Sequence, residues 1–316
     1  MKNLIKKIQN TVSLNDLWER DSKIVACISG GPDSACLLDI LDKIKKKSNI
    51  EIHIAHVNYG LRGKDSDRDE KMVEKLAEKY GLNLSVLKVN KIKKENINEE
   101  DLRNIRYKFF EEIKNELAYD FILVAHNQDD QVETFLMHLL RGSGLRGLSG
   151  MKYKNGKIIR PLLGTSRKEI LEYLKENKLK YRIDKTNETN LFFRNKIRNK
   201  LIPQLEKDVN PNIKKVIADS TLNIAEDLSL ISELSKKYFK NTKEIKISHI
   251  LKLHPALQKR LIFKKIENIK GDLKNIESAH IEEVVKIIKS NKSKNQRLSF
   301  QGLKITRRGD KLFILK

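Results

Sequence analysis

Short apolar runs alternate with charged segments along the first half of the sequence. The apolar runs lie at 23–28, 50–57, 82–89 and 121–125, and each is rich in Ile, Val and Leu. Continuous runs of this length are typical of strands buried on both faces of a sheet. The charged segments at 33–47, 65–80 and 98–117 have the three-to-four spacing of amphipathic helices. This alternation predicts an α/β fold, a doubly wound parallel five-stranded sheet covered by helices.

The pattern becomes less regular after this first half. We expect a helix at 128–140, a glycine-rich loop at 142–150, a hairpin at 151–160, a helix at 166–176 and a basic helix at 191–205. Asn155-Gly156 is a strong turn signal for the hairpin, and Ser166 is a suitable N-cap. Pro203 is expected to lie near the end of the basic helix.

The C-terminal third is helical and lysine-rich from about residue 213 to residue 290. Alternation returns at 298–316 around Arg308-Gly309-Asp310, and predicts a terminal β-hairpin. One face of that hairpin would carry Leu303, Ile305, Leu312 and Ile314. We therefore expect two domains, a catalytic domain at 1–212 and a smaller, mainly helical domain with a terminal hairpin at 213–316.

The net charge of the sequence indicates the kind of binding partner. Lys and Arg number 65 against 42 Asp and Glu, a net charge of +23, and basic residues outnumber acidic ones two to one after residue 215. Such an excess favours a polyanionic partner such as a nucleic acid, and it is densest in the second domain. A compositional bias toward lysine is the alternative explanation.

Cysteine use and the N-terminal sequence indicate a compartment. Cys27 and Cys36 are the only cysteines, which leaves neither a disulfide framework nor a cysteine-rich metal site. No apolar segment has the composition of a signal peptide or the length of a membrane span. We expect a cytoplasmic protein that binds no membrane.

A glycine loop lies where the first strand ends and the first long helix begins. Backbone N–H groups and a helix N-terminus converge there, which suits an anion. Its residues are Ser29, Gly30, Gly31, Pro32, Asp33 and Ser34. The carboxylate of Asp33 beside a phosphate suggests Mg²⁺. The loop lacks the Gly-x-x-x-x-Gly-Lys-Ser/Thr pattern and resembles the SGGxDS loop of the PP-loop ATP pyrophosphatases, which cleave ATP between its α and β phosphates.

A second cluster of polar residues follows the fourth strand at 125–134. His126, Asp129, Asp130 and Glu133 are spaced by three or four, so several share one face at the start of a helix. The carboxyl ends of parallel strands meet at one edge, which places this cluster beside the glycine loop. The carboxylates could hold a metal or a cationic substrate, or could merely complement the helix dipole.

Other candidates carry weaker signals. His56 and Asn58 close the second strand on the same edge, where they could bind a ligand or be ordinary turn residues. Arg103 and Arg106 could bind an anion or coat a solvated helix face. The glycines at 142–147 fit Gly-x-Gly-x-x-Gly, but this segment follows a helix instead of a strand. We interpret it as a flexible basic loop that carries Arg141 and Arg146 and is suited to phosphate contact or to closing over the site.

The motifs together resemble one family of the PP-loop superfamily, the tRNA(Ile)-lysidine synthetases. The matching segments are SGGPDS at 29–34, HVNYGLR at 56–62, LRNIRY at 102–107, AHNQDDQVET at 125–134, RGSGLRGLSGM at 141–151, RPLL at 160–163, DKTN at 184–187 and RNKIR at 194–198. Tyr59 and Asn127 depart from that pattern, since family members commonly have His at both positions. Longer members carry a further C-terminal domain that we expect this sequence to lack.

The resemblance implies a ligase that uses ATP and Mg²⁺. It would adenylate the C2 oxygen of cytidine at the wobble position of tRNA(Ile) with a CAU anticodon, and free L-lysine would then displace AMP to give lysidine. The implied catalytic residues are Asp33, Asp130, Glu133, Arg103 and Arg106. ATP would bind residues 29–34, His56 and Asn58, and Mg²⁺ would bind Asp33, Asp129 and Asp130. Contacts with tRNA are expected from Arg141, Arg146, Arg194, Arg198, Arg307 and Arg308.

Three rival functions differ in what they need from the chain. A tRNA thiolation enzyme needs paired reactive cysteines, and Cys27 and Cys36 look like core residues instead. A binding module without catalysis does not need so many carboxylates beside bound phosphates. An amide synthetase for small molecules does not need a basic second domain. The oligomeric state is open, with a homodimer as one alternative.

Overall fold

The computed structural model describes residues 2–89, 98–182, 193–238, 244–273, 275–291 and 295–316. The chain divides into two compact units. The first unit holds residues 1–137 and 151–219, and the second holds residues 138–150 and 220–316. The expected catalytic domain at 1–212 and the expected helical domain at 213–316 stay a prediction. The DKTN motif at 184–187 lies outside the described residues.

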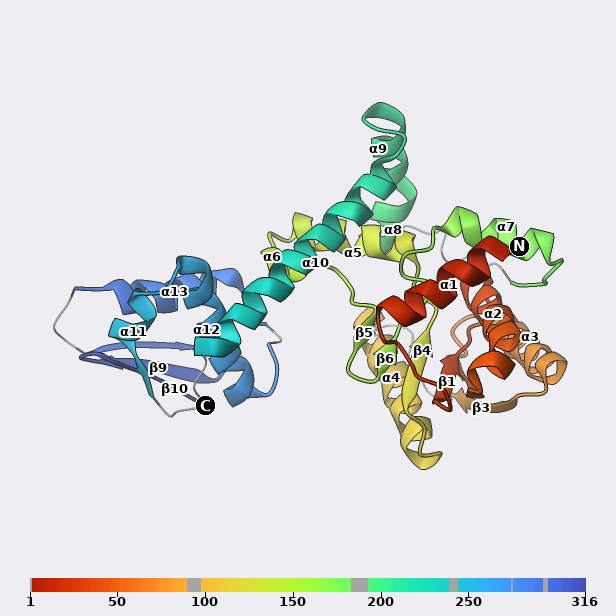
Figure 1. Ribbon diagram of the computed structural model, residues 1–316, viewed down its shortest axis with the longest axis horizontal. Coiled ribbons are helices and arrows are strands. Elements are labelled where there is room, and N and C mark those ends of the chain that lie inside the picture. Colours follow the sequence, from red (N-terminus) through yellow and green to blue (C-terminus); the bar gives the residue numbers. More distant parts are fainter. Residues whose placement is uncertain (1, 90–97, 183–192, 239–243, 274, 292–294) are drawn as a thin grey trace. The chain divides into compact units, whose positions relative to one another are not determined.

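The first unit alternates strands and helices, as Figure 1 shows. Its elements in chain order are α1 (Lys2–Leu14), β1 (Lys23–Cys27), α2 (Pro32–Ser48), β2 (Glu51–Asn58), α3 (Lys64–Tyr80), β3 (Asn83–Lys88), α4 (Glu99–Glu116), β4 (Phe121–Val124), α5 (Gln128–Leu140), β5 (Lys154–Asn155), β6 (Ile158–Ile159), α7 (Arg167–Glu176), α8 (Phe193–Lys196), η2 (Ile197–Leu201) and α9 (Ile202–Asp208). The last three residues of α5 belong to the second unit, and α10 (Ile213–Tyr238) begins in the first unit and continues into the second.

The sheet of the first unit has the strand order β3-β2-β1-β4-β6-β5. Every neighbouring pair from β3 to β6 is parallel, with Ile24 opposite both Ile52 and Phe121. The predicted parallel five-stranded sheet is therefore confirmed. The hairpin at 151–160 adds a sixth strand, because β5 pairs antiparallel with β6 at the edge.

The two faces of β1 enter different cores. Ile24 and Ala26 are fully buried in the cluster that includes residues of α1, α2, α3 and α7. Val25, one position between them, packs with Phe109 and Phe110 of α4 on the opposite face. Side chains alternate along a strand, so a run buried at every position needs cover on both sides. This doubly wound arrangement brings the carboxyl ends of β1, β2 and β4 to one edge of the sheet.

Two details of the predicted helices need comment. Ser166 caps α7 as expected, in a capping box with Glu169. The basic helix at 191–205 does not end near Pro203, and this expectation is wrong: residues 193–208 form α8, the π-helical segment η2 and α9. Pro203 lies at the start of α9, directly after the π-helical segment, so its missing N–H falls where the hydrogen-bond pattern of the helical run changes. Residues 191 and 192 lie outside the described residues.

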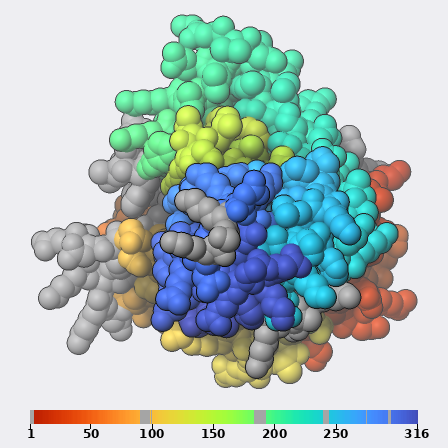
Figure 2. Space-filling view, turned by 90° about the vertical axis from the view of Figure 1, so that its left-hand side faces the viewer, coloured from red at the N-terminus to blue at the C-terminus, as the bar shows by residue number. Residues whose placement is uncertain are grey.

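The second unit is a helical layer on a small antiparallel sheet. Its remaining elements are α6 (Leu145–Leu148), β7 (Glu244–Lys246), α11 (Ile247–Leu251), α12 (Pro255–Lys270), α13 (Ser278–Lys289), β8 (Gln296–Phe300), β9 (Leu303–Arg308) and β10 (Lys311–Leu315). The predicted hairpin is β9–β10, and its four apolar residues named above are each at most 2% exposed. Strands β7 and β8 flank it in the order β7-β10-β9-β8. In Figure 2 the last strands (dark blue) and the helices before them (lighter blue) share one surface.

The prediction of uninterrupted helix up to residue 290 missed β7. This strand has only three residues, too few for a periodic pattern, and it forms because Ile245 pairs with Leu312 of β10. Among the described residues, no helix is long and apolar enough to cross a membrane.

Candidate functional site

The glycine loop connects β1 to α2 at the carboxyl edge of the parallel sheet. Gly30 has a φ of +81°, which a residue with a Cβ adopts only with strain. Gly31 occupies the N-cap of α2 with no side-chain capping hydrogen bond, and Pro32 begins the helix. The Ser34 hydroxyl donates to the Gly31 carbonyl at 2.9 Å. The first N–H groups of α2 are thus left for a ligand, and the helix dipole favours an anion there.

A cavity of about 210 Å³ opens beside this loop. Its walls come from the ends of β1, β2 and β4 and from α4. The lining residues are Cys27, Ile28, Ser29, Gly31, Asp33, Ser34, His56, Val57, Tyr59, Arg106, Tyr107, Phe110, Val124, Ala125 and His126. Such a cavity at the carboxyl ends of parallel strands is the usual ligand site of an open α/β sheet.

His56 presents a hydrogen-bond acceptor to this cavity. Its Nδ1 lies 2.8 Å from the Ile28 carbonyl, which can only accept, so Nδ1 carries the proton. Burial lowers the pKa of His56 and keeps the ring neutral. Its Nε2 is buried and makes no hydrogen bond within the described part of the chain. A buried acceptor of this kind suits a ligand that carries an N–H or O–H group.

Asp33 lies in the first turn of α2, paired with Arg167 at the start of α7. Burial raises the pKa of the Asp33 carboxyl, and the charge of Asp130 acts in the same direction. The nearby Arg167 opposes this rise without cancelling it. Asp33 is therefore a carboxylate that accepts a proton more readily than an exposed aspartate.

Two carboxylates of α5 hold two arginines. Glu133, 1% exposed, accepts from Arg194 Nε at 2.6 Å and from Arg198 Nε at 2.5 Å. Asp130 Oδ1 accepts from the same two arginines at 2.8 and 3.4 Å. Burial acts to raise the pKa of Asp130, but Arg194 and other neighbouring groups bring it below its usual value. These contacts form an ionised cluster where α8 and η2 meet α5.

Asp129 points to a different set of partners. Its Oδ1 accepts from the backbone N–H of Arg167 at 2.9 Å, and its Oδ2 lies 3.2 Å from Nζ of Lys214. Asp129 thus caps the start of α7 instead of joining Asp130 and Glu133.

The three carboxylates expected to bind magnesium are each held by a cationic group, and their role as magnesium ligands stays a prediction. Asp33, Asp129 and Asp130 each pair with a cationic side chain, and in the described residues no group of three or more His, Cys, Asp or Glu is arranged to hold a metal ion. A Mg²⁺ ion needs several oxygen ligands at short distance. These three carboxylates could hold the ion only after releasing their present partners Arg167, Lys214, Arg194 and Arg198.

Comparison with known proteins identifies the fold and the loop. The family model described as a PP-loop domain matches residues 1–205. The chain belongs to the PP-loop family. A PP-loop domain implies ATP binding, and the matched range includes the glycine loop at residues 29–34, which we call the PP-loop.

Curated relatives extend the match beyond the PP-loop domain. The tRNA(Ile)-lysidine synthase of Clostridium tetani is 38% identical over 302 residues, which are 92% of this chain and 65% of the relative. That of Caldanaerobacter subterraneus is 38% identical over 312 residues, 94% of this chain and 66% of the relative. The chain thus spans slightly less than two thirds of the length of these relatives. Among solved structures, a U34-tRNA thiolase of Methanococcus maripaludis has a TM-score of 0.59 at 24% identity, covering 71% of this chain and 78% of that chain, and this likeness shows the fold alone.

Arg103 and Arg106 take different places on α4. Arg106 lines the PP-loop cavity, and its Cζ lies 5.8 Å from the centre of the Tyr107 ring. Arg103 stacks more closely on the same ring, at 4.6 Å. Arg106 is therefore the better placed of the two for an anion in the cavity.

Asn58 has a different environment from His56, although both close β2. Its amide nitrogen donates to Glu70 at 2.7 Å and to Asp67 at 3.2 Å, and its oxygen accepts from the N–H of Gly60. The Asn58 side chain thereby fixes the turn between β2 and α3. Its expected contact with ATP stays a prediction.

The arginines expected to bind tRNA also have structural partners. Arg194 and Arg198 belong to the ionised cluster described above. Arg307 Nη1 donates to three carbonyls at the end of α13, at 2.6 to 3.1 Å. Within the second unit, Arg146 pairs with Glu267 at 3.2 Å, and Arg141 is exposed. Arg308 is exposed on β9, with its Cζ 5.9 Å from the Phe313 ring.

Two residues of the site, Arg160 and Arg167, were not singled out from the sequence as site residues. Arg160 is 4% exposed, and its Nε donates to Nδ1 of His126 at 3.2 Å. Burial lowers the pKa of His126, which lines the cavity in its neutral form. Arg167, the partner of Asp33, follows the helix cap Ser166. The RPLL segment gave a signal for Arg160, but no local pattern distinguishes Arg167 from other basic residues on helices.

Proposed function

We propose that this chain attaches lysine to C2 of cytidine at the wobble position of an isoleucine tRNA with a CAU anticodon. ATP would be converted to AMP and pyrophosphate, and the lysidine formed would change codon reading from AUG to AUA. The supporting observation is that relatives named tRNA(Ile)-lysidine synthase match 89–94% of this chain and not only its PP-loop domain.

The first step is adenylation of the base. The C2 oxygen of cytidine attacks the α-phosphorus, a new P–O bond forms, and the bond to the bridging oxygen breaks as pyrophosphate leaves. The N–H groups at the start of α2 and the hydroxyl of Ser29 lie where they can hold phosphate oxygens, and the Ser34 hydroxyl can do so by leaving the Gly31 carbonyl. Arg106 lines the same cavity and can offset the negative charge that builds during transfer.

The second step is attack by the side-chain amine of lysine on C2, which expels AMP together with the former C2 oxygen. The ammonium group, with an ordinary pKa of about 10.4, must first lose a proton. We assign this proton to Asp33, whose pKa is raised by burial. Asp130 has a lowered pKa and stays ionised, so it is better suited, together with Glu133, to bind the ammonium in competition with Arg194 and Arg198.

The positive charge of the chain supports tRNA as the partner. The net charge of +23 and the excess of basic residues after residue 215 suit a phosphate backbone. Arg141 and Arg308 are exposed and are the best placed of the expected arginines for this contact. Free L-lysine, the CAU anticodon, Mg²⁺, the cytoplasmic location and a homodimer stay part of the proposal.

Thiolation of tRNA is the rival function, because the solved structure with a similar fold is a U34-tRNA thiolase. Cys36 is fully buried, and burial raises the pKa of both Cys36 and Cys27, which disfavours the thiolates that sulfur transfer needs. Cys36 therefore behaves as a core residue, and Cys27, although it lines the cavity, has a raised pKa that disfavours its thiolate, which favours an amine over sulfur as the incoming nucleophile.

A labelling assay tests the proposal. The protein is incubated with ATP, Mg²⁺, radiolabelled lysine and the CAU-anticodon isoleucine tRNA, and methionine tRNA with the same anticodon is the matched control. We expect label in the isoleucine tRNA alone, and its loss when ATP is omitted. Label in neither tRNA, under conditions where the protein binds both ATP and tRNA, would refute the lysine step.

A further inference from the structure

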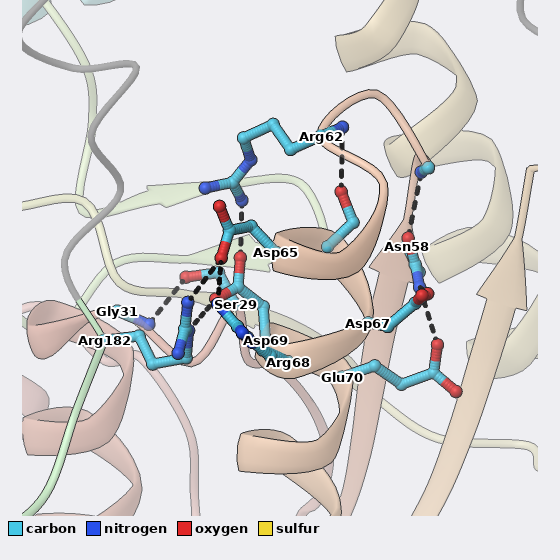
Figure 3. Close-up of polar contacts among 12 residues, drawn as sticks. Ser29, Gly31, Asn58, Arg62, Asp65, Asp67, Arg68, Asp69, Glu70 and Arg182 are labelled. Carbon is cyan, nitrogen blue, oxygen red and sulfur yellow. Dashed lines mark hydrogen bonds and ion pairs between the residues drawn. The ribbon is translucent and has the colours of Figure 1, made fainter.

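Arg160 is a buried arginine that none of the steps above uses. It follows β6 directly, it is only 4% exposed, and its Nη1 donates to the carbonyl of Lys152 at 2.9 Å. Other arginines near the PP-loop contact carboxylates, and Figure 3 shows Arg182 beside Asp65 and Asp69. In the described part of the chain, no carboxylate pairs with Arg160. A buried charge without a carboxylate partner is costly, so it favours an anion close by.

The contact with Arg160 fixes the tautomer of His126. Arg160 Nε donates to His126 Nδ1 at 3.2 Å, and a guanidinium can only donate. Nδ1 is therefore unprotonated, and the neutral ring carries its proton on Nε2. Within the described residues Nε2 has no hydrogen-bond partner, and His126 lines the PP-loop cavity. His126 thus offers the cavity an N–H donor, whereas His56 offers it an acceptor.

The charges around His126 keep its ring neutral. Burial has the largest effect and lowers the pKa of His126, and the charges of Arg160, Arg194 and Arg103 act in the same direction. Asp130 opposes this fall without cancelling it. A proton on Nδ1 would also face the N–H of Arg160. The N–H of Nε2 is therefore a lasting donor, which suits a ligand atom that only accepts.

His126 lies between the PP-loop and the ionised cluster of α5. It follows β4, which is the direct neighbour of β1, and the loop begins where β1 ends. On the other side, the charge of Asp130 acts on the ring. In the proposed reaction the α-phosphate joins the pyrophosphate, which the loop suits, to the cytidine that the lysine attacks. The α-phosphate is thus the part of the nucleotide that belongs between the loop and Asp130.

We infer that Arg160 is a positioning residue that holds His126 as a hydrogen-bond donor to an oxygen of the α-phosphate. The inference rests on the proposed function, because ATP, the adenylated cytidine and AMP all carry this phosphate. Phosphate oxygens only accept hydrogen bonds, so they fit an N–H that stays protonated. A fixed donor at this place offsets the charge that builds on the α-phosphate as pyrophosphate leaves. The guanidinium on the far side of the ring polarises the imidazole and strengthens its N–H as a donor.

Two ligands that differ only in the α-phosphate provide the test. Kd values for AMP and for adenosine are measured by NMR titration on the wild type, His126→Phe and Arg160→Met. His126→Phe removes the donor without changing the net charge, because the ring is neutral, and Arg160→Met removes the group that fixes the donor. We expect both to weaken AMP binding by about tenfold or more, the size of a lost hydrogen bond to a charged group, and to change adenosine binding by less than about twofold. His126→Gln, whose amide keeps an N–H near the place of Nε2, should recover part of the AMP affinity.

Nitrogen NMR of the histidine rings measures the positioning separately. The signals of His126 are those that disappear in His126→Phe. We expect the wild-type ring to be protonated on Nε2 alone, and the ring in Arg160→Met to be a mixture of both tautomers. Support of the fold by Arg160 would not change the tautomer. A wild-type proton on Nδ1, or the same tautomer in Arg160→Met, would overturn the inference.

His53→Phe is the matched control. His53 is another buried histidine of the first unit, 7% exposed, with its Nε2 2.9 Å from the Ser85 hydroxyl, and it is not among the residues that line the cavity. We expect its affinities for AMP and adenosine to equal those of the wild type. Trp18 fluorescence during unfolding checks that each variant keeps the fold of the first unit.

The outcomes separate the two proposals. Equal losses of AMP and adenosine affinity, or a loss of AMP affinity in Arg160→Met alone, would overturn the His126 donor even if lysine is attached to tRNA. A selective loss of AMP affinity in both variants, with His53→Phe unchanged, would support it. If that selective loss is seen while no lysine is attached to tRNA, the His126 donor stands and the proposed lysine ligation is wrong.

Discussion

Replacement of Glu133 by glutamine tests the ionised cluster on α5. Glutamine keeps the size of the side chain and removes its charge. Glu133 is 1% exposed and makes three hydrogen bonds of 2.5 to 3.0 Å to Arg194 and Arg198. The substitution therefore leaves two guanidinium groups with Asp130 as their remaining carboxylate.

The expected loss of stability follows from these contacts. Removing one partner of a fully buried ion pair costs about 3–5 kcal/mol. The arginine side chains here are 21% and 37% exposed and retain Asp130, so water and the remaining carboxylate reduce the penalty. We expect the free energy of unfolding of the first unit to fall by about 2–3 kcal/mol.

A single tryptophan makes the measurement specific. Trp18, the only tryptophan, is 7% exposed in the core of the first unit, so its fluorescence reports this unit even if the second unit unfolds separately. With a urea m-value of about 2 kcal/mol/M, the midpoint should fall by about 1–1.5 M. The exposed Glu172→Gln on α7 is the control and should change stability by less than about 0.5 kcal/mol. A Glu133→Gln midpoint within about 0.25 M of the wild type would refute the reasoning, because a shift that small corresponds to about 0.5 kcal/mol.

Three other predictions concern stability, hydrogen exchange and the binding of ATP and tRNA. Gly30→Ala should destabilise the first unit by about 1–2 kcal/mol and weaken ATP binding, because a Cβ is strained at a φ of +81°. An unfolding midpoint, followed by Trp18 fluorescence, and a Kd for ATP that both equal the wild-type values would contradict this. Burial acts to raise the pKa of Asp39, but hydrogen bonds from Lys43 and two tyrosines lower it, so its contribution to stability is complete above about pH 4 and is lost as the pH falls through the lowered pKa. Asp39→Asn should therefore flatten the acid side of the stability profile, measured by urea titration at several pH values. Arg307→Ala should speed amide hydrogen exchange at the end of α13, where Arg307 holds the backbone carbonyls. Arg308→Ala should leave this exchange unchanged. It should reduce the slope of log K for tRNA binding against log salt concentration by about one.

Local sequence patterns were sufficient for much of the first unit. The runs at 23–28 and 121–125 are apolar at almost every position, and only a strand covered on both faces places all of these side chains out of water. Ser166 followed by Glu169 is a capping box that involves a single turn of chain. The PP-loop is likewise contiguous, so its residues predicted both the turn and the anion.

The partners of the charged residues could not be predicted in this way. Asp130 and Glu133 have the helical spacing of a metal site, yet their partners are Arg194 and Arg198, more than sixty positions away in the chain. A carboxylate can bind Mg²⁺, ammonium or guanidinium, and its place on a helix does not show which one it binds. The choice depends on which cation the rest of the chain places within 3 Å.

The sequence alone determined the alternation of strands and helices in the first unit, the glycine loop and the basic character of the chain, because each depends on neighbouring residues or on composition. Tertiary structure decided that Asp33 pairs with Arg167, that Glu133 is buried between two arginines, and that Arg182 meets Asp69 next to Gly30. These pairs join segments separated by more than sixty residues. Side-chain spacing along a helix or strand carries no information about such distant partners, and only the folded chain brings them within hydrogen-bonding distance.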